Sequence, residues 1–359
     1  MDLLHEQGVV VIQFLQRQFE DYAGLMQTIS HLGDPRNAFL IYFPLAFCLH
    51  KPTGVQVLWL ASLSEWINAL LKWVLHGERP YWWVREAGRY GDNETILQQF
   101  SVTCETGPGS PSGHAMVTAS VLFCMVTALL NAWNPRKMFK LLMWTLFAVF
   151  MLTVNISRLF IATHFPQQVV LGTALGILLT VSLARFQLAT VNYPVCFSSS
   201  FVILTSCVTL FYMFRWIGLD PQWSIAMATK HCERSDWIHL DTTPFNAVFR
   251  DAGAIIGLGV YQFVATKSKS SKLHLAVHNP LPFIIRLWHI VCGIFLCHLS
   301  ENVKPGQNSE VFFYLCTCMK FGLLVFVVML VTTVFSPEKL NTKSSADDRH
   351  AYVGNDKIE

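Results

Sequence analysis

Charged residues are scarce in this sequence: Asp, Glu, Lys and Arg make up only 14% of its 359 residues, whereas hydrophobic residues make up 53%. Soluble domains carry about 25% charged residues. The chain therefore lacks the polar surface that a water-facing globule would need, and its mean hydropathy is +0.41. Its apolar residues also gather in blocks of roughly 20, the length of one helical crossing of a bilayer. The composition predicts an all-α, polytopic membrane protein that contacts lipid.

Other absences narrow the class. The net charge is only +3 and no long basic run occurs, which excludes nucleic acid as a partner. No basic region precedes the short apolar patch at 9–15, so we expect no cleavable signal peptide. The ten cysteines follow no paired spacing, and most lie in apolar runs as small buried residues. Ser110 stands where a cysteine phosphatase would need Arg after Cys104, which excludes that chemistry.

The apolar blocks predict about nine transmembrane helices around a helical-bundle core. We expect them at about 27–49, 55–76, 114–133, 140–159, 168–187, 199–218, 246–265, 281–299 and 311–334. Asp34-Pro35-Arg36 interrupts the first; if Asp34 caps a helix that begins at Pro35, the residues before it lie along the membrane surface. We expect residues 1–335 to form one transmembrane domain. The polar tail, 336–359, is expected to be disordered and cytoplasmic.

Basic residues in short connections predict the orientation of the chain. The 134–140 and 266–274 connections are rich in Lys and Arg, which favours the cytoplasmic side for both. The N-terminus and the 77–113, 160–167, 219–245 and 300–310 loops then lie on the opposite, luminal side. Asn93 opens an Asn-Glu-Thr sequon in the first of these loops, so we expect it to be glycosylated. Cys104 and Cys232 also fall on this side, either as a disulfide or as two free thiols.

Three short segments on the luminal side carry residues suited to phosphate chemistry. Lys72 and Arg79 are seven residues apart, close to two helical turns, so they project from one face if the helix continues. Ser112-Gly113-His114 ends a Gly/Pro/Ser-rich loop and starts a helix, where free backbone N–H groups and the helix dipole favour an anion.

The third segment brings an arginine and a histidine to the end of the fourth predicted span. The guanidinium of Arg158 suits bidentate phosphate binding. His164, six residues later, is a candidate nucleophile. Each segment alone also has a structural interpretation, namely a lysine that extends to the interface, an ordinary capped helix and an interfacial histidine. Together the segments supply a phosphate cradle, a nucleophile and an acid on one side of the membrane, which favours one active site.

The order and spacing of these segments resemble the three-part signature of the type 2 phosphatidic acid phosphatase and vanadium haloperoxidase superfamily. The chain is closer still to the glucose-6-phosphatase catalytic subunits over about residues 30 to 335. The similar stretches are Lys72-Trp73, Arg79-Pro80-Tyr81-Trp82-Trp83-Val84, Cys104-Glu105-Thr106-Gly107-Pro108-Gly109-Ser110-Pro111-Ser112-Gly113-His114 and Trp237-Ile238-His239-Leu240-Asp241-Thr242-Thr243-Pro244-Phe245.

The resemblance implies a hydrolase of gluconeogenesis in the endoplasmic reticulum membrane that releases glucose from glucose 6-phosphate in the lumen. It implies that His164 forms a phosphohistidine and that His114 protonates the departing sugar oxygen. No metal or cofactor is implied, whereas a transporter for glucose 6-phosphate is, because this charged substrate does not cross a bilayer unaided. The residues that would hold the phosphate are Lys72, Arg79, Ser112, Gly113 and Arg158.

Some positions depart from the wider pattern and leave alternatives open. Gln168 stands where the superfamily has Asp to orient the nucleophile, and Gln167 where a second His is usual among glucose-6-phosphatases. The candidates for a sugar pocket are Trp82, which lies beside Arg79, and His239 and Asp241. The alternatives are a lipid phosphate phosphatase, which typically has about six spans and the orienting Asp, and a catalytically weak relative that only binds sugar phosphates.

Overall fold

The computed structural model describes residues 2–90, 96–238, 240–268, 283–301 and 309–334. Within these ranges the chain is helical and contains no β-strand. Six helices are long and apolar enough to span a membrane. They are α6 (Gly113–Trp133), α7 (Lys137–Phe160), α8 (Pro166–Leu183), α9 (Tyr193–Trp216), α11 (Pro244–Lys267) and α13 (Glu310–Val334). These six confirm the predicted all-α membrane architecture, but they do not confirm a count of nine spans.

The remaining predicted spans form helices of a different character. Helix α4 (Lys51–Leu75) has 25 residues, the length of a full span. Buried Glu65, Asn68 and Lys72 occupy its second half, where they lower its hydropathy and face the interior of the bundle. Helix α12 (Phe283–Glu301) includes a shorter apolar stretch, Ile290–Leu299. The polar face of α4 is therefore the main departure from uniformly apolar spans.

The single helix predicted over 27–49 does not form. Helix α2 (Ala23–Leu32) ends before a turn, after which the π-helix η2 (Ala38–Tyr42) continues into α3 (Phe43–Leu49). Asp34 Oδ1 accepts the backbone N–H of Arg36 at 2.8 Å, and the Arg36 guanidinium binds the same carboxylate. These local hydrogen bonds compete with helical ones and hold the turn. The new helix begins at Ala38, not at Pro35 as the capping alternative predicted.

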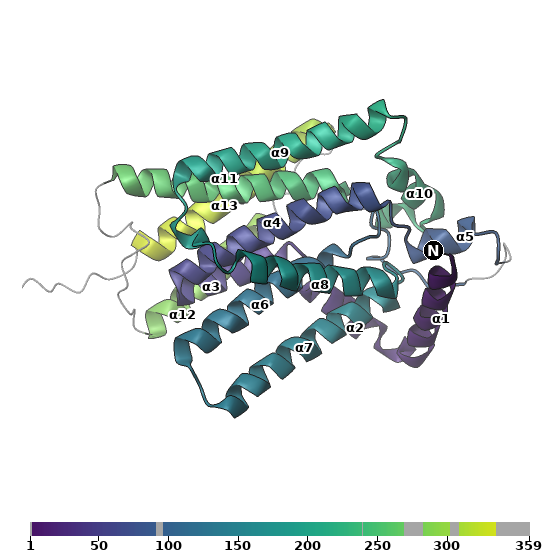
Figure 1. Ribbon diagram of the computed structural model, residues 1–359, viewed down its shortest axis with the longest axis horizontal. Coiled ribbons are helices and arrows are strands. Elements are labelled where there is room, and N and C mark those ends of the chain that lie inside the picture. The colour runs from purple at the N-terminus through teal and green to yellow at the C-terminus, as the bar shows by residue number, and fades with distance from the viewer. Residues whose placement is uncertain (1, 91–95, 239, 269–282, 302–308, 335–359) are drawn as a thin grey trace, which may run out of the picture.

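The N-terminal helix α1 (Asp2–Gln18) packs on one end of the bundle beside α5 (Pro80–Glu86), as Figure 1 shows. It buries Val9 and Ile12, while Val10 and Phe14 on its other face stay exposed. The short helix η1 (Glu20–Tyr22) links it to α2. Gln16 Nε2 donates to the carbonyl of Phe160 at 2.7 Å, so α1 is tied to the C-terminal end of α7.

The long helices lie side by side along the molecule, and the connections that lead into α6, α8 and α11 gather with α5 and α10 (Trp223–His231) at one end (Figure 1). Helix α11 packs against α13, α9 and α4, and α6 packs against α4 and α8. A Cβ added at Gly253 would lie 2.1 Å from the carbonyl oxygen of Cys318, and one at Gly257 would lie 2.2 Å from that of Gly322. Glycines thus permit the close approach of α11 and α13.

A disulfide between Cys104 and Cys232 fixes the 96–112 loop against the end of α10. The sequence left this pair open between a disulfide and two thiols. Ser224 Oγ adds a hydrogen bond to the carbonyl of Thr106 at 2.8 Å. Three short helices complete the described elements: η3 (Leu188–Thr190), η4 (Ser235–Trp237) and η5 (Leu240–Thr242). The predicted sequon at Asn93 and the tail 336–359 lie outside the described residues.

Candidate active site

Arg79 joins two loops at the polar end of the bundle. It is the residue before α5, and its side chain is fully buried. Its Nε donates to the carbonyl of Gly107 at 2.7 Å, while Nη1 donates to that of Thr163 at 3.1 Å. A further bond runs from Nη2 to the carbonyl of Pro108 at 3.3 Å. One guanidinium therefore binds the 96–112 loop and the turn at 161–165 together, which the fork geometry of arginine permits.

Ser112 starts helix α6 and belongs to the same loop. Its hydroxyl accepts from the N–H of Ala115 at 3.5 Å, and its own N–H donates to the carbonyl of Gln168 at 3.1 Å. A Cβ at Gly113 would lie 3.2 Å from Asn68 Oδ1, so a small residue lets α6 begin close to α4. The first turn of α6 places His114 at the edge of a cavity. This helix N-terminus presents N–H groups and positive potential to the site.

Arg158 lies in the last turn of α7 and is 1% exposed. Its Nη1 donates to Ser30 Oγ at 2.7 Å, and its Nη2 pairs with Glu105. Its Nε is buried and has no hydrogen-bond partner. Ala162 follows with a φ of 54°, in the left-handed region, and so reverses the chain between α7 and α8. This reversal brings the next turn back over Arg158.

His164 is fully buried in that turn. Its Nδ1 lies 2.8 Å from the carbonyl oxygen of Gly109 and 3.3 Å from Gln168 Oε1. Both neighbours accept hydrogen bonds, so Nδ1 carries the proton and Nε2 keeps its lone pair. Nε2 is buried and unpartnered. Burial, and then the charges of Arg79 and Arg158, hold the pKa of His164 well below its usual value, so the ring is neutral at neutral pH.

Gln168, at the position of the superfamily's Asp, is part of the same network. Its Oε1 also accepts the N–H of Phe165 at 3.1 Å, and its Nε2 donates to the carbonyl of Glu78 at 2.7 Å. The side-chain amide thus uses both ends to fix the start of α8. A carboxylate there would lose the bond to Glu78. The Gln168 amide and the Gly109 carbonyl together orient the His164 ring.

Glu105 lies among the cations. Its Oε2 is 2.9 Å from Arg79 Nη2, its Oε1 pairs with Arg158 Nη2, and Oε1 lies 3.8 Å from His114 Nδ1. Burial disfavours its charged form, but Arg158 and Arg79 outweigh burial and hold the pKa of Glu105 well below its usual value. The sequence alone assigned Glu105 no role. The available signal was that Glu105 is the one acidic residue in the Gly/Pro/Ser-rich stretch from 105 to 114.

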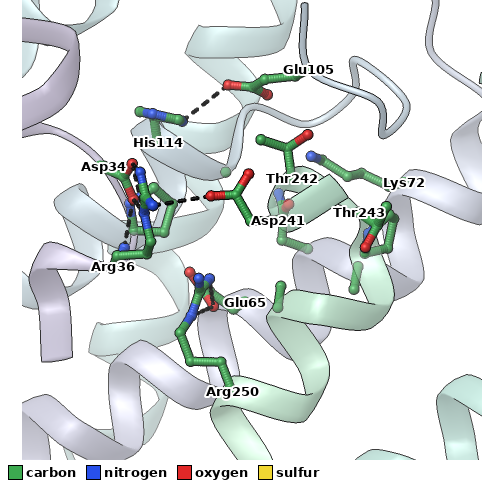
Figure 2. Close-up of a pocket in the computed structure, with 16 residues that line it drawn as sticks. Asp34, Arg36, Glu65, Lys72, Glu105, His114, Asp241, Thr242, Thr243 and Arg250 are labelled. Atoms are coloured by element: carbon green, nitrogen blue, oxygen red, sulfur yellow. Dashed lines mark hydrogen bonds and ion pairs between the residues drawn. The ribbon is translucent and has the colours of Figure 1, made fainter. Parts of the chain in front are cut away.

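A cavity of about 90 Å³ adjoins these groups, with room for several water-sized groups. Figure 2 shows its polar lining: Arg36 reaches Asp34 on one side and Asp241 on the other, at 2.7 Å and 3.1 Å. Burial disfavours the charged form of Asp34, but Arg36 outweighs burial and holds the pKa of this carboxyl below its usual value. Glu65 and Arg250 form a second buried ion pair at the base. The cavity is therefore polar, and Arg36 and Arg250 in its lining are both held in ion pairs.

The structure brings the seven residues that the sequence assigned to phosphate chemistry to one end of the bundle. Lys72 lines the cavity, and its charge acts on both His114 and His164. Only one of the three sugar-pocket candidates lines the cavity in the described part of the chain. Asp241 lines the cavity, and its buried Oδ1 has no hydrogen-bond partner.

Trp82 and His239, the other two candidates, gain no support. Trp82 is fully buried and does not line the cavity. Its indole meets Trp223 edge-on at 5.9 Å, and its Nε1 donates to Glu78. His239 lies outside the described residues. Within the described ranges no group of three or more His, Cys, Asp or Glu side chains is arranged to hold a metal ion.

Comparison with known proteins places this geometry in a family. The model of the PAP2 superfamily matches residues 53–191, a range that includes every segment assigned to the phosphate. Glucose-6-phosphatase catalytic subunit 1 of Canis lupus familiaris is 36% identical over 323 residues, which cover 88% of this chain and 89% of the relative. Glucose-6-phosphatase 2 of Homo sapiens is 35% identical over 343 residues, 92% and 96% of the two chains.

A further relative extends the same relationship. Glucose-6-phosphatase catalytic subunit 1 of Haplochromis nubilus is 36% identical over 346 residues, 93% of this chain and 95% of the relative. No solved structure gives a significant match. With its buried histidine, its arginine pair and this degree of identity over nearly the whole length, the chain is a phosphatase of the membrane and belongs to the glucose-6-phosphatase family.

Proposed function

We propose that this chain hydrolyses glucose 6-phosphate at a luminal active site through a phosphohistidine intermediate. The observation that carries the proposal is the state of His164. Its Nε2 is buried, unpartnered and unprotonated, and Arg79, Arg158 and Lys72 act on it from close by. A neutral imidazole surrounded by cations suits attack on the phosphorus of a dianion, whose oxygens need those charges.

In the first step, the lone pair of His164 Nε2 forms a bond to phosphorus as the bond from phosphorus to the sugar oxygen breaks. Lys72, Arg79 and Arg158 neutralise the non-bridging oxygens, with help from the Ser112 hydroxyl and the N–H of Gly113. The carbonyl of Gly109 accepts from Nδ1–H and so supports the positive charge that develops on the ring. Gln168, a neutral amide, provides less of this support than the superfamily's Asp would.

His114 completes the proton balance. It donates a proton to the departing sugar oxygen, so glucose leaves as a neutral alcohol. The neutral ring then takes a proton from water as the water oxygen attacks the phosphohistidine. The bond from phosphorus to His164 breaks, phosphate leaves, and both histidines return to their starting forms. The position of His114 at the edge of the cavity, which Lys72 also lines, suits both steps.

The cavity supports a sugar rather than a lipid. Its lining includes the Arg36 pairs with Asp34 and Asp241, the side chain of Asn68, and the hydroxyls of threonines in the η5–α11 connection. Burying an acyl chain against such groups would leave them without water or a partner. A hexose can exchange hydrogen bonds with them, and Asp241 Oδ1 is a free acceptor for a hydroxyl. The relatives are named for glucose 6-phosphate, which agrees with this substrate class.

The proposal extends to the cellular setting that the sequence predicts. The chain resides in the endoplasmic reticulum, with its N-terminus and active site luminal and its C-terminus cytoplasmic, and it depends on a transporter to deliver its substrate. The basic connections at 134–140 and 266–274 support this orientation. So does the disulfide between Cys104 and Cys232, which forms in an oxidising compartment.

The test is phosphate release from glucose 6-phosphate by permeabilised microsomes that contain the full-length chain. We expect activity in the wild type and in His231→Ala, a histidine outside the site, and none in His164→Ala at equal protein level. Vanadate, which mimics five-coordinate phosphorus, should inhibit. Equal activity of His164→Ala and the wild type would refute the nucleophile. Hydrolysis of phosphatidate but not of glucose 6-phosphate would favour the lipid alternative, and binding without turnover would favour the weak relative.

A further inference from the structure

Glu105 occupies the position on the arginines that a phosphate group needs. Its two carboxylate oxygens pair with Nη2 of Arg79 and Nη2 of Arg158. The other donors of Arg79 bind loop carbonyls. In Arg158, Nη1 donates to Ser30, and Nε is buried and has no hydrogen-bond partner. The donors left for a phosphate are thus the ones that Glu105 binds, together with the Nε of Arg158.

A phosphate dianion and Glu105 cannot hold these donors together. Two anions at hydrogen-bond distance of the same guanidinium groups repel each other, and each would lose part of its solvation. The dianion carries more charge and three oxygens in place of two, and it can also engage the unpartnered Nε of Arg158. The phosphate therefore displaces the carboxylate.

The displaced carboxylate has a partner close by. Its Oε1 already lies 3.8 Å from His114 Nδ1, so a shift of about 1 Å brings the two to hydrogen-bond distance. The backbone of Glu105 does not have to move. Its N–H donates to the carbonyl of Thr103 at 2.9 Å, its carbonyl accepts from the Tyr81 hydroxyl at 3.0 Å, and the preceding Cys104 is held in the disulfide. Only the side chain rotates.

We propose that phosphate binding moves the Glu105 carboxylate from Arg79 and Arg158 onto Nδ1 of His114, where it becomes the positioning residue for the proton donor. This inference rests on the proposed phosphohistidine reaction. The charged groups that face His114 are Lys72 from α4, Arg158 from α7, Asp34 from the turn after α2, and Glu105. A directly bonded carboxylate favours the imidazolium form of a histidine. His114 is thereby charged when the substrate phosphate is in place.

The experiment compares Glu105→Gln with the wild type in three measurements: the inhibition constant of vanadate, turnover of glucose 6-phosphate, and turnover of p-nitrophenyl phosphate. Removing the competing charge should tighten vanadate binding at least threefold. Losing the carboxylate on His114 should slow glucose 6-phosphate turnover by about ten- to hundredfold, within the usual contribution of a general acid. Turnover of p-nitrophenyl phosphate should fall less than threefold, because p-nitrophenolate leaves without a proton. Glu86→Gln, an exposed carboxylate of α5, is the matched control.

Each other outcome overturns part of the proposal. Weaker vanadate binding in Glu105→Gln would mean that Glu105 holds the arginines permanently and is not displaced. Tighter vanadate binding with unchanged turnover of both substrates would mean that Glu105 leaves without serving His114. Equal losses with both substrates would indicate a structural role only. Failure of the wild type to hydrolyse glucose 6-phosphate would refute the proposed function, whereas vanadate affinity and p-nitrophenyl phosphate turnover would still test the displacement.

Discussion

Replacing Arg79 with lysine should cost more stability than the same replacement at Arg158, although both are proposed to bind the phosphate. Arg79 donates to three buried carbonyls, those of Gly107, Thr163 and Pro108. Lysine has one ammonium in place of the planar fork and cannot restore this pattern, so at least two carbonyls lose their partner. At roughly 1–3 kcal/mol for each buried group left unpaired, we expect a loss of about 3 kcal/mol.

Arg158 gives the matched comparison because its neighbours differ. Apart from its pair with Glu105, Arg158 donates to the hydroxyl of Ser30, and that single bond is worth about 1 kcal/mol. The difference of about 2 kcal/mol corresponds to roughly 3 °C in the apparent Tm of a chain of this size. Both variants should lose hydrolysis of glucose 6-phosphate. Thermal unfolding of the purified proteins in one detergent measures the difference. An Arg158→Lys variant that is destabilised as much as Arg79→Lys, or more, would refute the assigned loop-bracing role of Arg79.

Three further predictions concern helix packing, the disulfide and pH. Gly257→Ala should lower the apparent Tm, because the added Cβ would meet a backbone carbonyl of α13 at 2.2 Å. Gly24→Ala should leave the apparent Tm unchanged, because no atom lies within 4 Å of its Cβ. The reverse order in a thermal scan would contradict this packing. Cys104→Ser and Cys232→Ser should each destabilise the chain by about 2–5 kcal/mol. The double variant should lose no more stability than either single variant, because both remove the same disulfide. Additive losses in the same scan would mean that the two cysteines do not pair. The lowered pKa of His164 means that the unfolded chain binds a proton that the folded chain does not, so stability should fall as pH drops below about 6.5. The fall between pH 7 and pH 5 should be smaller in His164→Asn than in the wild type, and an identical fall in Tm would count against a neutral His164.

Hydropathy was sufficient to predict the helices that face lipid. The six long apolar helices match predicted spans to within six residues at each end, because a bilayer requires an unbroken apolar length. The first span could not be placed this way. Its break at Asp34 depends on the hydrogen bonds of Arg36, and at Gly33 a Cβ would lie 2.7 Å from a methyl of Val154 on α7. Hydropathy carries no information about such tertiary contacts.

The residues of the candidate site could likewise be predicted only in part. Chain order and residue type were sufficient to select the cations and histidines, which the structure brings to one cluster. Trp82 was selected because it lies near Arg79 in the sequence, yet the turn of α5 directs its ring into the interior against Trp223. Glu105 and Arg36 were missed because their partners are distant in sequence: Glu105 pairs with residues 26 and 53 positions away, and Arg36 with Asp241. Only the folded chain shows these charges meeting.

The proposed reaction requires that His164 takes the phosphoryl group. Glucose 6-phosphate with a radiolabelled phosphate is mixed with the full-length chain, the reaction is stopped in alkali, which preserves phosphohistidine, and the labelled peptide is identified. We expect label on Nε2 of His164 in the wild type and none in His164→Ala. Label on His114, or steady turnover with no labelled histidine at any time, would contradict it.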